Sequence, residues 1–342
     1  MVNKSVYYSN CHLFSFGCKV LGIIGARGIG KTYSCKKYIL KRFFNNGNVF
    51  AWLRDSENAL DEVMGNDGLK FFKDIKKDNE LKKYLDKAKI VVKDGVCKIN
   101  GKVCGYFMSC STFYKLKGTD YSDVSTIVYD EFIGEKTQAV RGDRAYEFLN
   151  MVETIGRLRN DYKIILTANA LDKGSSILDA LGIVIKGFGY YVNRSKDVAI
   201  HYADNNPMYL QKKLASISGK LMNNTAFGDN LLYNDFSSNK VELYDKKPKG
   251  CKCLCIFRNQ YNQRIKIDFK GGMFYISNDE NELSNKAYRF VMSLDLVNVE
   301  YKLANKDLVE GIQNAIGQGM VKYQSDRVYN ITMELFSKSK KK

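Results

Sequence analysis

Short apolar runs alternate with longer amphipathic stretches along the first half of the chain. Residues 18–26 form an apolar run that ends in glycines, and residues 30–44 follow it with helical spacing. A second apolar run, 48–54, precedes a charged stretch, 55–89, that we expect to be mostly helical. The pattern therefore predicts a strand, a loop and a helix, followed by a second strand.

The alternation continues to about residue 200. Residues 89–109 alternate around Gly95 and Asn100-Gly101, which indicates hairpins. The nearly continuous apolar runs 124–131 and 163–170 are typical of buried parallel strands, and an amphipathic helix is expected from 144 to 160. These features predict an α/β fold with a doubly wound, mainly parallel sheet that binds its ligand at the carboxyl ends of the strands.

The pattern changes after about residue 200. Residues 208–224 resemble a short helical unit, and 237–250 resemble a linker. Consecutive antiparallel strands are expected after that, with helical stretches at the end of the chain. We therefore expect three parts, namely an α/β domain (1–200), a helical linker subdomain (201–249) and a C-terminal domain (250–342).

The charge balance of the chain is strongly basic. The 342 residues include 54 Lys and Arg against 37 Asp and Glu, which gives a formal net charge of +17 and a sequence pI near 9.3. Such an excess points to nucleic acid or an anionic membrane, or it serves solubility alone. No basic amphipathic helix with a strongly apolar face stands out, so nucleic acid is the favoured partner.

Nothing in the pattern indicates a membrane protein or an exported one. No apolar run is long enough to cross a bilayer, and the first residues lack the basic start and apolar stretch of a secretory signal. The expected location is the cytoplasm. The nine cysteines are scattered apart from Cys251, Cys253 and Cys255, for which buried free thiols are favoured over a zinc site.

One loop carries a complete phosphate-binding motif. Gly25 to Thr32 fits G-x-x-x-x-G-K-T and lies between a predicted strand and a predicted helix. Gly25, Gly28 and Gly30 allow the backbone N–H groups to curl around phosphate oxygens. Lys31 would neutralise the β and γ phosphates of ATP, and the Thr32 hydroxyl would bind Mg²⁺.

The apolar run 124–131 supplies the acidic partners of that loop. Asp130 ends the run and would point a carboxylate at the metal. Glu131 follows directly and would polarise the attacking water, which favours ATP hydrolysis over phosphate transfer to a bound acceptor. An ordinary exposed acid at a strand end remains the alternative for Glu131.

Other polar residues near these strands have weaker assignments. Asn169 ends the next predicted strand and would sense the γ phosphate, although a turn-forming Asn fits as well. Arg157 and Arg159 end the amphipathic helix, where an arginine would stabilise transferring charge or simply favour the helix C-terminus. Lys117, and more weakly Arg27 and Arg54, are further candidates for reaching a phosphate.

A basic stretch lies between the two acids and the amphipathic helix. It carries Lys136, Arg141 and Arg144. In a ring of subunits these side chains would face a central channel and grip the DNA backbone, which needs charge rather than base readout. A solvated surface loop is the alternative.

The residues quoted above resemble those of a known family. GARGIGKT (25–32), VSTIVYDEFI followed by EK (124–136), the R-L-R of 157–159 and NITMELF (330–336) are similar to the genome-packaging ATPases, terminase-like DNA encapsidation motors, of small short-tailed bacteriophages. The first two strings are fairly specific and the last is short. The similarity spans nearly the whole chain in order and length, but it is thin from about 200 to 329.

The resemblance implies a P-loop NTPase of the additional-strand, catalytic-Glu type that works as a homomeric ring of five subunits. Such a ring uses ATP and Mg²⁺, docks on the portal of a procapsid in the host cytoplasm and drives double-stranded DNA inward; it is not expected in the mature virion. It also implies that Arg157 is a finger acting in trans and that Lys117 reaches a neighbour's nucleotide.

For the C-terminal domain the resemblance implies a ribonuclease H-like α+β fold without nuclease activity. The strand KCLCIFR (252–258) has no carboxylate, whereas a two-metal nuclease needs clustered acids. In some members of the family this domain docks a structural RNA. The alternatives for the whole chain are a ring helicase or another nucleic-acid-stimulated ATPase, and a nucleotide-gated nucleic-acid-binding module with little hydrolysis.

Overall fold

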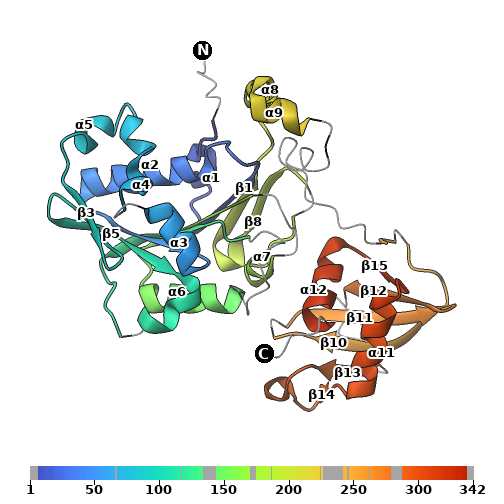
Figure 1. Ribbon diagram of the computed structural model, residues 1–342. Helices are drawn as coiled ribbons and strands as arrows, with labels where there is room; N and C mark the ends of the chain where they lie inside the picture. Colours follow the sequence, from blue (N-terminus) through green and yellow to red (C-terminus); the bar gives the residue numbers. More distant parts are fainter. Residues whose placement is uncertain are drawn as a thin grey trace. The chain divides into compact units, whose positions relative to one another are not determined.

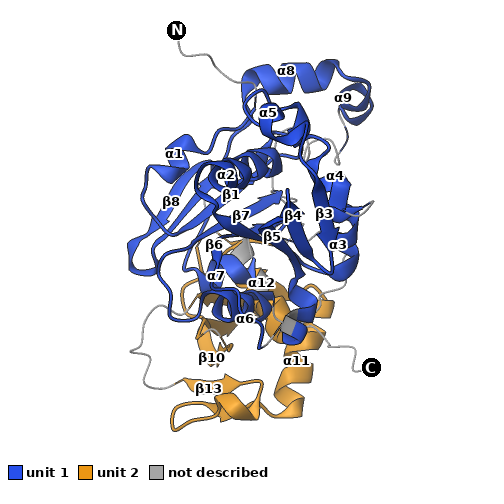
Figure 2. Ribbon diagram, turned by 90° about the vertical axis from the view of Figure 1, so that its left-hand side faces the viewer, with its two compact units in different colours: residues 1–237 blue, residues 238–342 orange. Residues whose placement is uncertain are grey.

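The computed structural model describes residues 7–65, 68–116, 118–133, 144–169, 175–185, 187–223, 225, 242–244, 246–260, 262–278 and 287–336. The chain divides into two compact units, 1–237 and 238–342, and each has its own hydrophobic core (Figure 2). The boundary falls within the predicted linker 237–250. The finer division into three domains stays a prediction.

Within the described residues, unit 1 is built on a nine-stranded sheet in the order β3-β4-β5-β2-β6-β7-β1-β9-β8 (Figure 1). The strands from β5 to β9 in that order pair in parallel, and β3, β4 and β8 are antiparallel at the edges. Their bounds are β1 Val20–Gly25, β2 Val49–Arg54, β3 Ile90–Lys93, β4 Val96–Ile99, β5 Lys102–Ser109, β6 Val124–Asp130, β7 Lys163–Asn169, β8 Gly189–Asn193 and β9 Val198–Tyr202.

Helices cover both faces of this sheet, as continuous apolar strands require. In Figures 1 and 2, α2 lies on one face, and α6 and α7 lie on the other. Successive residues of β6 show the two layers, because Val128 belongs to the core beneath α2 whereas the Tyr129 ring stacks on Phe148 of α6. The helices of unit 1 are α1 Cys11–Phe14, α2 Lys31–Asn46, α3 Glu57–Met64, α4 Leu69–Phe72, α5 Lys82–Leu85, α6 Arg144–Gly156, α7 Ser176–Ala180, α8 Pro207–Ala215 and α9 Ile217–Met222, with short 3-10 turns at Ile75–Lys77, Cys110–Leu116 and Arg194–Lys196.

The structure confirms the predicted order of strands and helices up to β7, and also the helical unit at α8 and α9. The sequence pattern missed β8 and β9. β8 mixes glycine and asparagine with tyrosine and valine and is only half-buried, whereas β9 is buried but has only three consecutive apolar residues before His201, so neither gives a long apolar signal. No helix in the described ranges combines the length and apolarity that crossing a membrane requires.

A histidine on β9 is buried among aromatic rings. The Tyr8 hydroxyl and His201 Nδ1 lie 3.0 Å apart, and the His201 ring stacks on Tyr190. Burial, with a smaller contribution from the neighbouring His12, lowers the pKa of His201 from 6.5 to about 4. The imidazole is therefore neutral in the folded chain near pH 5, whereas in the unfolded chain it is mostly protonated.

The unfolded chain accordingly binds more protons than the folded chain between pH 6.5 and pH 4, so folding stability should fall as the pH drops through that window. After allowing for the partial exposure of His201, we expect a loss of about 1 kcal/mol between pH 7 and pH 5 that His201→Gln removes. Urea unfolding followed by the fluorescence of Trp52, the chain's single and fully buried tryptophan, measures this. An equal pH dependence in both proteins would contradict it.

Unit 2 contains a mixed sheet, with both antiparallel and parallel strands. Within the described residues its order is β14-β13-β10-β11-β12-β15. The strands β10, β11 and β12 form the predicted antiparallel meander, and β13, β14 and β15 add to it in parallel. The bounds are β10 Lys252–Arg258, β11 Arg264–Lys270, β12 Met273–Asn278, β13 Tyr288–Val291, β14 Lys302–Leu303, β15 Val321–Tyr323, α11 Lys306–Gly317 and α12 Asp326–Phe336, with a 3-10 turn at Leu294–Leu296.

Candidate functional site

The phosphate-binding loop joins β1 to α2, as its motif predicts. Gly28 and Gly30 have φ angles of 86° and 100°, in the left-handed region that a side chain disfavours. The Tyr209 hydroxyl of α8 donates to the Arg27 carbonyl oxygen at 2.9 Å and lies 2.6 Å from where a Cβ on Gly28 would be. Both the backbone and the space therefore require glycine at 28.

Lys31 opens α2 and folds back into its own loop. Its Nζ donates to the carbonyl oxygens of Gly25 and Ala26 at 2.8 and 2.7 Å, and to Asn169 Oδ1 at 3.1 Å. Burial lowers the pKa of the Lys31 ammonium to about 8, although the charges of Asp130 and Glu131 oppose that effect. The ammonium is thus held at the loop by oxygen atoms that a phosphate group can replace.

Asp130 stands at the carboxyl end of β6 and is 3% exposed. Its Oδ1 accepts from the Thr32 hydroxyl at 3.0 Å and from the Thr167 hydroxyl, and its Oδ2 accepts from Arg54 Nη1 at 2.9 Å. A hydroxyl and a carboxylate side by side are the oxygen donors that Mg²⁺ takes when substrate phosphates complete its coordination. Thr32 and Asp130 therefore fit the predicted metal site.

Arg54, at the end of β2, pairs with both acids of the site. Its Nη1 reaches Asp130 and its Nη2 donates to Glu131 Oε2 at 2.7 Å. The arginine side chain is 9% exposed, whereas that of Glu131 is 46% exposed. The sequence indicated Arg54 only as a weak phosphate contact, whereas the structure makes it the partner of the acids. The sequence signal for this role is an arginine at the end of an apolar, buried strand.

Glu131 adopts a backbone conformation that its side chain disfavours. Its φ of 59° and the φ of 50° at Arg157 lie in the left-handed region. The other described non-glycine residues there are all Asn or Asp, which tolerate it better. Strain of this kind costs about 1 kcal/mol or more and tends to gather at functional positions. Two predicted catalytic residues thus carry it.

The loop, the acids and the end of β7 enclose a pocket of about 310 Å³. The predicted site residues that line it are Arg27, Gly28, Gly30, Lys31, Thr32, Asp130, Glu131 and Asn169. Gly25 pairs with Asn169 in the register of β1 and β7, which explains why residues so distant in sequence meet. One pocket therefore holds the predicted nucleotide, metal and water-activating groups, and their roles remain to be tested.

The two arginines after α6 have different surroundings. Arg159 is half-buried and donates to the carbonyl oxygens of four residues, Ser122, Val124, Tyr121 and Ile155, and to the Asp161 carboxylate. Arg157 is exposed, and its Nη2 reaches the Thr119 carbonyl oxygen at 3.3 Å. Arg157 does not line the pocket of its own chain. Arg159 is thus held by its own chain, and Arg157 is the accessible member of the pair.

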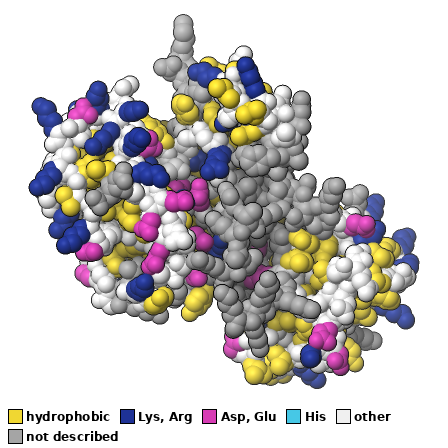
Figure 3. Space-filling model, viewed as in Figure 1, with side chains coloured by type: hydrophobic (Ala, Val, Ile, Leu, Met, Phe, Trp, Pro, Cys, Tyr) yellow, Lys and Arg dark blue, Asp and Glu magenta, His cyan; other side chains and the backbone are white. Residues whose placement is uncertain are grey.

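The predicted DNA contacts are described only in part. Lys117, Lys136 and Arg141 lie outside the described residues. Arg144 begins α6, is half-buried, and has Nη2 3.3 Å from Asp55 Oδ2. On the face drawn in Figure 3, lysine and arginine side chains are spread over unit 1 with acidic ones among them. The predicted grip on DNA through these residues stays a prediction.

In unit 2, the buried Asp268 of β11 faces a cation. Lys247 Nζ lies 2.7 Å from its Oδ2. Among the described residues, no three His, Cys, Asp or Glu side chains gather as a metal-binding group.

The cysteines of unit 2 differ from the expectation of three buried thiols. All three are free, but only Cys255 is buried, while Cys251 and Cys253 are half-exposed. Cys251 precedes β10, and the pairing of β10 with β11 shifts between Cys253 and Cys255. That irregularity breaks the regular alternation of a strand, which would place alternate residues on one face.

Comparisons with known proteins agree on one family. A model of the family described as Podovirus DNA encapsidation protein (Gp16) matches residues 2–341. The DNA packaging protein of Bacillus phage phi29 is 26% identical over 346 residues, which cover 98% of this chain and 99% of that protein.

Solved structures are similar over the whole chain or over its N-terminal part. A chain of the bacteriophage Phi-29 viral genome packaging motor assembly has a TM-score of 0.69 at 23% identity, covering 97% of this chain and 99% of that one. The N-terminal domain of the DNA packaging ATPase from bacteriophage phi29 has a TM-score of 0.51 at 28% identity, covering 59% of this chain and 99% of that domain.

Proposed function

The chain belongs to the Podovirus DNA encapsidation protein family, and on that premise we propose that it is the ATP-hydrolysing subunit of a phage DNA packaging motor. The observation that carries this function is the single pocket in which Lys31, Thr32, Asp130 and Glu131 meet. Those groups can bind a triphosphate, hold its metal and activate water. The charge of +17 suits a partner as acidic as DNA.

The loop would bind the phosphates of ATP through its backbone N–H groups and Lys31. The ammonium would exchange the carbonyl oxygens of Gly25 and Ala26 for phosphate oxygens, whose negative charge compensates the buried positive charge. Mg²⁺, held by Thr32 and Asp130, would neutralise charge on the phosphates. Asn169 accepts from Lys31 and is therefore placed to respond when the ammonium moves.

Glu131 would act as the base that orients and polarises the attacking water. In this structure its carboxylate is paired with Arg54 at 2.7 Å. Its Oε2 atom accepts from Arg54, so the carboxylate must leave Arg54 for both of its oxygens to be available to the water. The Glu131 side chain is 46% exposed, so it can move away from Arg54 without displacing packed neighbours. Its strained backbone would favour a local change of conformation at the same time.

Among the described residues that line the pocket, the cations are Arg27 and Lys31, both from the loop itself. Arg157 is exposed on the same unit but does not line this pocket, so it would complete the pocket of a neighbouring subunit in a ring. Lys117 would act beside it. A pentameric ring at the portal of a procapsid is the assembly that suits this arrangement, by analogy with the family.

The finer fold assignments belong to the same proposal. Unit 1 would be a P-loop NTPase of the additional-strand, catalytic-Glu type, with 1–200 as its core and 201–249 as a linker subdomain. The C-terminal domain (250–342), which lies within unit 2, would be a ribonuclease H-like domain that binds DNA or a structural RNA without cutting it. The meander β10-β11-β12 extended by parallel β13 and β14 supports this fold, and the pairing of the Asp268 carboxylate with Lys247 supports the absence of cutting.

ATP hydrolysis measured with and without double-stranded DNA and procapsids tests the function. We expect DNA and procapsids together to stimulate turnover, and Lys31→Ala to weaken ATP binding more than tenfold through loss of charge-assisted bonds. Lys212→Ala, at an exposed lysine of α8, is the control and should bind ATP normally. A rate of ATP hydrolysis that is the same with and without DNA would refute the proposal. Separation of DNA strands in the absence of procapsids would favour a helicase.

A further inference from the structure

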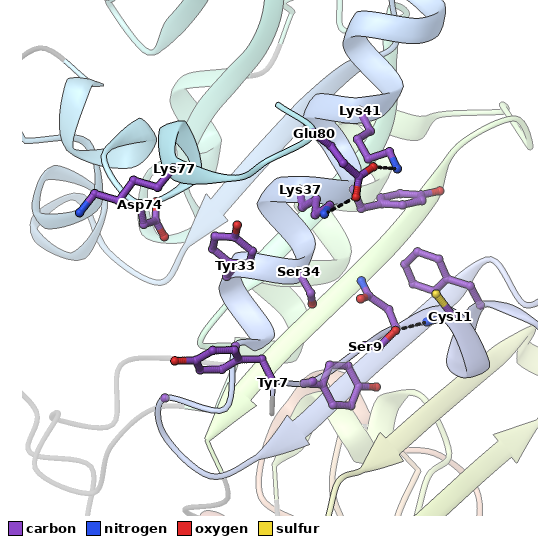
Figure 4. A pocket seen from close by; sticks show the side chains of 16 residues that line it. Tyr7, Ser9, Cys11, Tyr33, Ser34, Lys37, Lys41, Asp74, Lys77 and Glu80 are labelled. Atoms are coloured by element: carbon purple, nitrogen blue, oxygen red, sulfur yellow. Dashed lines mark hydrogen bonds and ion pairs between the residues drawn. The ribbon is translucent and has the colours of Figure 1, made fainter. Parts of the chain in front are cut away.

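Two tyrosines from distant parts of unit 1 lie together against the phosphate-binding loop. A cavity of about 820 Å³ borders the loop, and its walls include α2 and the segment 7–14 (Figure 4). Tyr7 of that segment lies 3.3 Å from where a Cβ on Gly30 would be. The ring centre of Tyr209, on α8, is 6.5 Å from that of Tyr7. The loop is therefore flanked by the N-terminal segment and by α8.

Two carbonyl oxygens of the loop are held by donors from outside it. The Tyr8 N–H donates to the Ile29 carbonyl oxygen at 2.8 Å, and the Tyr209 hydroxyl donates to the Arg27 carbonyl oxygen at 2.9 Å. Tyr8 and Tyr209 do not line the phosphate pocket. Both donors therefore bind the loop from outside that pocket.

The bond from Tyr209 fixes the direction of a backbone N–H. The described peptides are all trans, and in a trans peptide the C=O and the N–H of the next residue point in opposite directions. The Arg27 carbonyl oxygen points to Tyr209, so the Gly28 N–H of the same peptide points the other way. Gly28 lines the phosphate pocket, and its N–H is therefore placed to meet a phosphate oxygen.

The oxygen atom of Tyr209, rather than its ring, makes the close approach to the loop. The hydroxyl lies 2.6 Å from where a Cβ on Gly28 would be, whereas the ring carbon Cζ that carries it lies 3.8 Å away. The second distance is an ordinary van der Waals contact. Removing the oxygen alone should therefore release this part of the loop.

Tyr209 has a well-defined position in the first turn of α8. The Asn206 side chain caps this helix, and Pro207 occupies its first position. The residues before the cap are tied to β1, because the Ala203 N–H donates to the Ile24 carbonyl oxygen at 2.8 Å. The segment that carries Tyr209 is therefore anchored to the same strand that leads into the loop.

The Tyr209 hydroxyl keeps its proton at neutral pH. Burial, and to a smaller extent Tyr7, raise the pKa of this hydroxyl above its ordinary value. A protonated hydroxyl can donate, whereas a carbonyl oxygen only accepts. The bond to the Arg27 carbonyl oxygen is therefore present throughout the neutral range.

We propose that Tyr209 is a positioning residue for the phosphate-binding loop: its hydroxyl holds the Arg27–Gly28 peptide so that the Gly28 N–H points to the phosphates of the nucleotide. A loop that is ordered before binding loses less entropy on binding, so the ligand binds more tightly. This inference rests on the proposed function, because it concerns the phosphate contacts of the same ATP site. It gives α8, in the predicted linker subdomain (201–249), a part in nucleotide binding.

Tyr209→Phe tests the proposal, because it keeps the ring and removes the hydroxyl. We expect ATP and inorganic tripolyphosphate, both with Mg²⁺, to bind about fivefold more weakly, since one hydrogen bond contributes about a factor of two to ten. Both ligands should lose the same factor, because both present phosphate oxygens to the loop. Tyr84→Phe is the matched control, since the Tyr84 ring stacks on Phe44 and lines neither the pocket nor the cavity. It should bind both ligands as the unchanged chain does.

Steady-state hydrolysis with DNA and procapsids separates positioning from a general effect on stability. The loop contacts the phosphates both before and during the reaction, so Tyr209→Phe should raise KM and leave kcat unchanged. A structural defect would instead lower kcat, because fewer subunits would be folded, and would leave the KM of the folded subunits as it was.

The outcomes separate this proposal from the proposed function. Unchanged binding of both ligands to Tyr209→Phe, weaker binding of ATP alone, or a lower kcat at an unchanged KM would each overturn the positioning role while leaving ATP binding intact. A failure of the unchanged chain to bind either ligand would instead refute the proposed function, and the positioning role with it.

Discussion

Glu131→Gln should bind ATP as tightly as the unchanged chain and hydrolyse it at least a hundredfold more slowly, since a positioned base contributes about 10² to 10⁴ in rate. The glutamine amide oxygen can still accept from Arg54, so the site should keep its geometry. Glutamine is as strained as glutamate at a φ of 59°, so the backbone cost is unchanged. The loss would therefore reflect the missing base alone.

ATP binding and steady-state hydrolysis, both measured with DNA and procapsids present, separate the two effects. Glu57→Gln is the matched control, because Glu57 also pairs with a cation, Lys115 at 3.1 Å, but at an exposed position away from the pocket. It should hydrolyse ATP normally. Hydrolysis at the full rate by Glu131→Gln would remove Glu131 from the mechanism.

The local parts of this site were predictable from the sequence. Gly25 to Thr32 specifies its own conformation, because glycines at the left-handed positions, a strand before and a helix after all lie within one short stretch. Asp130 and Glu131 follow a run that can only be a buried strand. Each of these signals needs only neighbours in the chain.

The role of Arg54 depends on contacts that the sequence does not contain. β2 and β6 lie side by side, with Leu53 opposite Tyr129, and this register brings the arginine to acids more than 70 residues away. The cavity beside the loop is a similar case, since its walls join 7–14 with α2. Short, partly exposed strands such as β8 and β14 were missed because burial, not local pattern, defines them.

Arg157 and Arg159 are the clearest example of this limit. Both belong to one three-residue string, and family resemblance alone favoured the first. The structure adds that Arg159 is bound to backbone carbonyl oxygens around residues 121–124, whereas Arg157 remains accessible in a strained conformation. The distinction depends on the fold of a segment that lies some 35 residues earlier in the chain.

A ring in which Arg157 acts on the neighbour's nucleotide makes a second strong prediction. Arg157→Ala alone should lower hydrolysis by about 10³-fold or more, the usual contribution of such a finger. Rings that mix Arg157→Ala subunits with Glu131→Gln subunits should recover activity. A Glu131→Gln subunit still has its arginine, and an Arg157→Ala subunit still has its glutamate. Where the first donates its arginine to the second, the interface is complete. With random equal mixing this happens at about one interface in four.

The same design decides between the two arginines. Arg159→Ala removes five described contacts of its own subunit, so it should lower the melting temperature, and its defect should not be rescued in rings mixed with Glu131→Gln. Recovery with Arg159→Ala and none with Arg157→Ala would exchange their roles. No recovery in either mixture, once subunit exchange is verified, would mean that each subunit completes its own site, and the exposed, strained Arg157 would then need another explanation.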